Sequence, residues 1–123
     1  MTSVVWAMDI YHGWCDLKEG VRDMAFVEAF TRYMEHLKGE GRIESYRLTR
    51  RKLGLGPSAL GEFHFMIEVR DLAQLDEAFS FVAMRAAPIE GEHHGVNSLV
   101  QNIQFALYRD FPDAVRKQGE EKF

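Results

Sequence analysis

The chain has 123 residues, with 46% hydrophobic and 28% charged types, a formal net charge of −4 and a pI near 5.7. A chain of this length forms one domain and can bury a core without metal or disulfide support. Its acidity lacks the basic surplus of a nucleic-acid-binding protein, so we expect no nucleic-acid partner. The apolar runs are short and no signal-peptide pattern is present, so we expect a cytoplasmic protein without a membrane partner. The single Cys15 fits a reducing compartment and is expected to be a small buried hydrophobe.

The first half of the chain predicts a strand, a helix and a second strand. Residues 3–12, SVVWAMDIYH, are rich in β-branched and aromatic types and predict a strand that ends at Gly13, followed by a loop, WCDLKEG. From about Asp23 to Lys38, apolar residues recur at three- and four-residue steps and predict an amphipathic helix. Residues 43–53 alternate between polar and apolar types and predict the second strand.

The second half predicts two more strands around a second helix. The turn residues of GLGPSALG lead into a third strand, EFHFMIEVRD, at residues 62–71. Asp71 is a natural N-cap for a helix that ends before Pro88, and IEGEHHGVN is then a polar loop. Residues 98–108 predict the fourth strand, so that 1–108 form the domain and 109–123 a short C-terminal helix or tail.

This order, β-α-β-β-α-β, predicts a ferredoxin-like α+β sandwich with an antiparallel sheet in the order 4-1-3-2 and both helices on one face. The alternation assigns one apolar face to the core under the helices. That face comprises Trp6, Met8, Ile10, Tyr46, Leu48, Phe63, Phe65, Ile67, Val69, Ile103, Phe105 and Leu107. The open face is left with a mixture that includes Ala7, Asp9, Tyr11, Ser45, Arg47, Thr49, Glu62, His64, Met66, Glu68, Val100, Asn102, Gln104, Ala106 and Tyr108.

The charged and polar residues of the open face predict a half-wet interface with a second sheet. We expect Arg47 to lie opposite His64 or Met66 and to pair with Glu68. The full interface network is expected to comprise Asp9, Arg47, His64, Glu68 and Gln104. An alternative is that His64, Glu68 and Asp9 form a general-base or metal cluster. The network explains these residues without a ligand, because the charges of Arg47 and the carboxylates offset one another. His93 and His94 are adjacent and rarely aim at one ion, so we expect no metal site.

Two known families share this strand order. The FHF at 63–65 superficially resembles the third-strand aromatics of the RNA-recognition motif. In that family the aromatic rings point away from the helices, whereas Phe63 and Phe65 share the core face here, so RNA binding is not expected.

Over residues 1–108 the chain resembles the dimeric α+β-barrel superfamily, in which two ferredoxin-like protomers pack sheet against sheet. The resemblance lies in strand order, single-domain length and the mixed open face, with GLGPSALG and the tail as arms that wrap a dimer. It implies a homodimer, in an uncharacterised bacterial family within the superfamily. Members include cofactor-independent monooxygenases, haem-degrading enzymes, lactone isomerases and ligand-binding domains of transcription regulators. The resemblance concerns architecture, and no catalytic motif is carried over.

The resemblance also implies a ligand site between helices and sheet, near Trp6, His12, Trp14 and Phe30, with His12 as the acid-base candidate. We expect a small apolar or aromatic ligand and no cofactor. The leading hypothesis is a small-molecule-binding protein of the cofactor-independent monooxygenase or isomerase type. The alternative is a non-catalytic ligand-binding or assembly module that acts as a homodimer. A substrate-free cavity between the side chains of Trp6 and Phe30 would favour the first hypothesis, and a filled core with a tight sheet-sheet interface the second.

Overall fold

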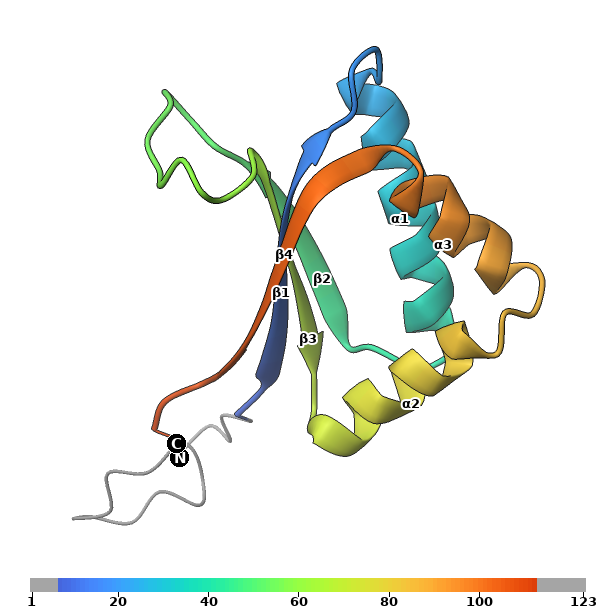
Figure 1. Cartoon of the computed structure of the whole chain (residues 1–123). Coiled ribbons are helices and arrows are strands. Elements are labelled where there is room, and N and C mark those ends of the chain that lie inside the picture. The colour runs from blue at the N-terminus through green and yellow to red at the C-terminus, as the bar shows by residue number, and fades with distance from the viewer. Residues whose placement is uncertain (1–6, 113–123) are drawn as a thin grey trace.

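The computed structural model describes residues 7–112. Its elements are β1 (Asp9–Leu17), α1 (Asp23–Gly39), β2 (Ser45–Arg50), β3 (Phe63–Val69), α2 (Leu72–Ala83), α3 (Ile89–Asn97) and β4 (Val100–Arg109). The strands form one antiparallel sheet in the order β2-β3-β1-β4, which is the predicted order read from the other edge. The helices lie on one side of the sheet, and in the described part of the chain the other side carries no helix (Figure 1). The ferredoxin-like prediction is confirmed.

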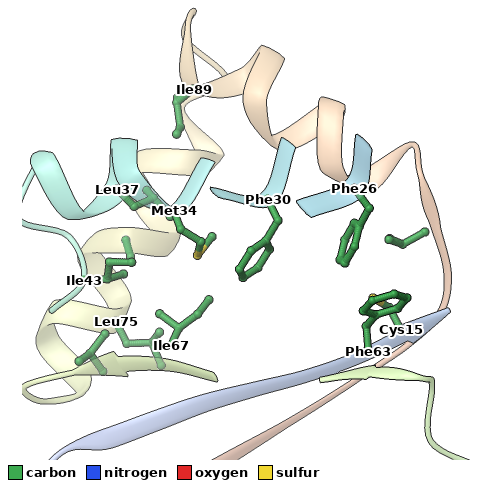
Figure 2. Close-up of a cluster of buried hydrophobic side chains, with 13 residues drawn as sticks. Cys15, Phe26, Phe30, Met34, Leu37, Ile43, Phe63, Ile67, Leu75 and Ile89 are labelled. Carbon is green, nitrogen blue, oxygen red and sulfur yellow. The ribbon is translucent and has the colours of Figure 1, made fainter. Parts of the chain in front are cut away.

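The core lies between α1 and the sheet. Phe26, Phe30 and Met34 project from α1 towards the sheet, where Phe63 and Ile67 face them (Figure 2). The three residues of α1 follow the spacing of the predicted helix. All five side chains are less than a tenth exposed. Burial of side chains of this size contributes about 1.5 to 3 kcal/mol each, which fixes the position of α1 on the sheet.

The second helix begins as predicted. The carboxylate of Asp71 accepts a hydrogen bond from the backbone N–H of Gln74 at 2.8 Å, so it caps α2. This cap satisfies one of the N–H groups that the first turn leaves free.

The segment predicted as a polar loop is instead the helix α3, and that prediction is wrong. Ile89 is 1% exposed and Val96, seven residues later, packs against the core, so one face of α3 is apolar. His36 of α1 forms a hydrogen bond with Glu92 and ties the two helices together. Gly91 and Gly95 have low helix propensity and hide this periodicity, so tertiary packing decides the conformation.

The first strand does not end at Gly13 but runs through it to Leu17. A Cβ on Gly13 would lie 1.9 Å from Cζ of Phe65, the residue paired with Gly13 on β3. The ring of Phe65 therefore lies over the backbone of Gly13, and the glycine marks a close approach within the sheet.

This register reverses the predicted faces of β1. Cys15 is buried in the core and Tyr11 packs against it, so the odd-numbered residues of β1 face the helices. Ile10, His12 and Trp14 consequently lie on the open face, where Ile10 was not expected. Trp6 lies outside the described residues.

A bulge in β4 corrects a second face assignment. The pairing of β4 with β1 shifts between Trp14 and Asp16, and Asn102 there has a φ of 53°. Asp16 accepts hydrogen bonds from the Asn102 side chain at 3.0 Å and from the Glu62 backbone N–H at 2.8 Å. Because the bulge adds a residue to one strand, Val100 turns to the helix side, where it is 7% exposed.

The predicted faces of the other strands match the structure. Arg47 lies opposite Met66, one of its two predicted positions. Ser45, however, lies opposite Glu68, and no ion pair joins Arg47 to Glu68 among residues 7–112. The expected Arg47–Glu68 pair is therefore absent from the described part of the chain.

Candidate functional site

A cavity of about 300 Å³ lies between the helices and the sheet. Its walls are largely aromatic and aliphatic, with Phe30 and Met34 from α1 and Phe65 and Ile67 from β3. Pockets of this size and composition suit small organic molecules. The cavity adjoins the cluster of buried side chains in Figure 2.

Four polar side chains line this cavity, and they come from three elements: Tyr11 from β1, Tyr33 from α1, and His93 and Asn97 from α3. Within residues 7–112, none of the four side chains forms a hydrogen bond. The rings of Tyr33 and His93 lie next to each other, with centroids 5.7 Å apart. Because their hydrogen-bonding groups are not used within the described residues, these side chains are available to a ligand.

Burial keeps the Tyr33 hydroxyl protonated. It raises the pKa of Tyr33 to about 12, with smaller contributions from the charges of Tyr11, Glu90 and Glu92. Burial also raises the pKa of Tyr11. Both hydroxyls can therefore donate a hydrogen bond into the cavity at neutral pH.

Three aromatic side chains of the cavity lining, from β1, α2 and β4, contact one another. The ring of Tyr11 stacks on Phe105 and meets Phe79 edge-on, each with a centroid separation of 5.3 Å. Phe79 and Phe105 both line the cavity, although 48% and 55% of their surfaces are exposed.

Cys15 also lines the cavity but is unsuited to nucleophilic chemistry. The residue is 1% exposed, and its burial, with a smaller effect from the charge of Asp16, raises the pKa of the thiol to about 11. A thiol reacts as the thiolate, so Cys15 is a packing residue.

The structure does not bring the predicted ligand-site residues together. Phe30 lines the cavity as expected, whereas His12 and Trp14 lie on the opposite face of the sheet. The predicted grouping is wrong because it relied on the reversed faces of β1. His12 therefore lies away from the cavity that was expected to hold its substrate.

On the open face, His12 instead forms a cluster with His64. Nδ1 of His12 lies 2.8 Å from Nε2 of His64, and the two rings are nearly coplanar. The indole of Trp14 stacks on His64 with centroids 4.5 Å apart, and Tyr108 meets His12 edge-on at 4.9 Å. Burial lowers the pKa of both histidines, and the charge of His12 lowers that of His64 further.

Four of the five residues of the predicted interface network share this open face. Arg47, His64, Glu68 and Gln104 lie there, as the pairing of β2 with β3 and of Trp14 with Gln104 shows. Asp9 lies on the helix side and its carboxylate accepts two hydrogen bonds from the guanidinium of Arg109. Asp9 is 3% exposed, so it belongs to an internal ion pair.

None of the four polar side chains that line the cavity was assigned to the ligand site from the sequence. Tyr33 lies three residues after Phe30, on the inward stripe of α1, so its spacing is a usable signal. His93 lies on the segment predicted as a loop, and no local pattern reveals it. In residues 7–112, no three or more His, Cys, Asp or Glu side chains are placed to hold a metal ion, and no helix is long and apolar enough to cross a membrane.

The fold and the cavity define a ferredoxin-like α+β protein with an internal space between helices and sheet. The family model described as "Family of unknown function (DUF6614)" matches residues 8–123, and the chain belongs to this family. Comparison with curated proteins gives no significant match.

Solved structures with the same fold have distant sequences. A dimeric ferredoxin-like protein of unknown function from Jannaschia sp. CCS1 has a TM-score of 0.62 at 12% identity, covering 82% of this chain and 97% of that one. A NIPSNAP family protein of unknown function from Agrobacterium tumefaciens has a TM-score of 0.62 at 12% identity, with coverages of 84% and 87%. A DABB family protein with a ferredoxin-like fold from Mesorhizobium loti has a TM-score of 0.58 at 13% identity, with coverages of 83% and 95%. These similarities support the fold.

Proposed function

We propose that this protein binds a small, largely apolar organic molecule in the cavity between its helices and its sheet. The observation that carries the proposal is a partly open cavity of about 300 Å³ lined by aromatic and aliphatic side chains. Cavities of this size and composition are typical of small-molecule sites.

The chemistry of the lining favours an uncharged ligand. No Asp, Glu, Lys or Arg is among the described residues that line the cavity. An ionised ligand would lose its hydration there without a counter-charge, which is unfavourable in an apolar environment. The absence of charged side chains from this lining also favours a binding function over a reaction that requires a charged catalytic group.

An enzymatic role of the monooxygenase or isomerase type is the second candidate. It is favoured by His93, the one imidazole that lines the cavity among residues 7–112. An imidazole is a common general acid or base in enzymes. In that case His93, and not His12, would be the acid-base residue.

A titration with naphthalene, followed by two-dimensional NMR of the labelled protein, tests the proposal. Ala78 lines the cavity and is 6% exposed, so Ala78→Leu fills part of the space and is expected to weaken binding by about tenfold or more. Ala73→Leu places the same side chain on an exposed position of the same helix and should bind as the wild type does. Thermal midpoints of both variants show that they remain folded. Absence of saturable naphthalene binding by the wild type would refute the proposal.

We also propose that the protein acts as a homodimer in which the open faces of two sheets meet. The open face mixes apolar and aromatic side chains such as Trp14 and Met66 with polar ones such as Arg47 and Gln104. Such a mixture is typical of interfaces that retain some water. The Jannaschia protein of the same fold is described as dimeric, which supports a dimer.

A further inference from the structure

Two neighbouring polar side chains of the cavity have no hydrogen-bond partner in the described part of the chain. Tyr33 from α1 and His93 from α3 have ring centroids 5.7 Å apart at an interplanar angle of 55°, and both line the cavity. Neither side chain forms a hydrogen bond within residues 7–112. Tyr11 and Asn97 are the other polar side chains of the lining, but Tyr33 and His93 are the two whose rings adjoin, so together they can bind one polar substituent.

The positions of these two groups are fixed by their helices. His36 lies three residues after Tyr33 on α1, and Glu92 directly precedes His93 on α3. The hydrogen bond between His36 and Glu92 therefore ties α1 to α3 beside the two groups. A site held in this way can discriminate between ligands because its donors and acceptors do not have to be ordered on binding.

The two groups have complementary hydrogen-bonding roles. The Tyr33 hydroxyl donates, because its pKa is raised to about 12 and it stays protonated. An imidazole nitrogen without a proton accepts. A ligand hydroxyl can satisfy both at once, accepting from Tyr33 and donating to His93, whereas a hydrocarbon leaves both unpaired.

We propose that the pair formed by Tyr33 and His93 selects a neutral, ring-shaped ligand that carries a hydroxyl group of the phenol or enol type. This inference rests on the proposed function and adds the chemical class of the ligand. The aromatic walls receive the ring, including Phe30 and Phe65, and the pair receives the oxygen. A carboxylate in place of the hydroxyl is excluded by the uncharged lining.

The test compares 2-naphthol, naphthalene and 2-naphthoate by NMR titration of the full chain at about pH 7. The wild type is expected to bind 2-naphthol about tenfold more tightly than naphthalene, and 2-naphthoate more weakly than either. Tyr33→Phe and His93→Leu should each remove most of the preference for 2-naphthol and leave the affinity for naphthalene within about twofold.

Matched controls use residues of the same type outside the cavity. Tyr46→Phe removes a hydroxyl that bonds to Glu35, and His94→Leu changes the exposed neighbour of His93. Both controls should keep the preference for 2-naphthol. If the wild type binds naphthalene and 2-naphthol equally, or if neither cavity variant changes the ratio, this inference is wrong while the proposed cavity function stands. If no probe binds, both proposals are wrong.

Discussion

At the scale of single residues, the histidine pair of the open face is the most informative feature. A hydrogen bond between Nδ1 of His12 and Nε2 of His64 requires one ring to donate and the other to accept, so at least one must be neutral. The sequence placed His64 on the correct face but could not reveal its partner. Burial lowers the pKa of both rings, and the charge of His12 lowers that of His64 further; the indole of Trp14 stacks on His64 in this cluster.

This pair predicts a loss of stability in mild acid. Because the folded pKa of both histidines lies below the ordinary value of 6.5, the unfolded chain binds protons more readily below that pH. Their contribution to stability is therefore complete above pH 6.5 and declines as the pH falls towards the folded pKa values. The thermal midpoint of the wild type should fall by a few degrees more than that of His64→Gln between about pH 7 and pH 5.

His94→Gln is the control for this measurement, since His94 is exposed on α3. Its midpoint should follow the wild-type curve. Parallel curves for the wild type and His64→Gln would show that protonation of the pair does not affect stability.

At the scale of elements, the glycines show how packing overrides local preference. Gly13 sits inside β1 because Phe65 occupies the space of a side chain, whereas Gly91 sits inside α3 with no atom within 4 Å of an added Cβ. Glycine is a poor residue in either element by propensity alone. Only position 13 requires glycine for steric reasons.

The same substitution should therefore have opposite effects at these two positions. Gly91→Ala is expected to raise the free energy of unfolding by about 0.5 to 1 kcal/mol, because alanine restricts the unfolded chain and favours the helix. Gly13→Ala is expected to lower it by about 1 to 3 kcal/mol, because Phe65 must move. Urea denaturation followed by circular dichroism measures both. A stabilising Gly13→Ala would show that the ring of Phe65 does not need this space.

At the scale of the whole molecule, the sheet separates two surfaces with different roles. The helix side holds the cavity with Tyr33 and His93, and the open side carries the histidine cluster and the mixed polar and apolar residues. We propose ligand binding on the first surface and dimer formation on the second. Because the two lie on opposite faces, a variant that affects one need not affect the other.

The proposed dimer is tested by a charge placed at the centre of the open face. Trp14→Glu would bury an unpaired carboxylate between the two sheets, so this variant should sediment as a monomer at micromolar concentration while the wild type sediments as a dimer. Met24→Glu is the matched control, because Met24 is 61% exposed on α1, on the other side of the sheet. Sedimentation of the wild type as a stable monomer would contradict the face-to-face arrangement.

The sequence alone determined the order of the strands, the positions of α1 and α2, and the inward faces of β2 and β3. These follow from local alternation and from helical spacing, since each such element has most of its apolar residues on one side. The fourth strand followed the same rule except at its bulge, where the extra residue that turned Val100 inward has no signature in the pattern.

Only the tertiary structure decided the orientation of β1, the existence of α3 and the composition of the cavity. Residues 10–15 of β1 carry bulky side chains on both faces, so alternation cannot choose between them until Phe65 packs over Gly13 and Cys15 enters the core. In α3, the contacts of Ile89 and the bond to His36 stabilise a helix that two glycines disfavour. His93 reaches the cavity through that helix, and its position beside Tyr33 depends on contacts between residues that are distant in sequence.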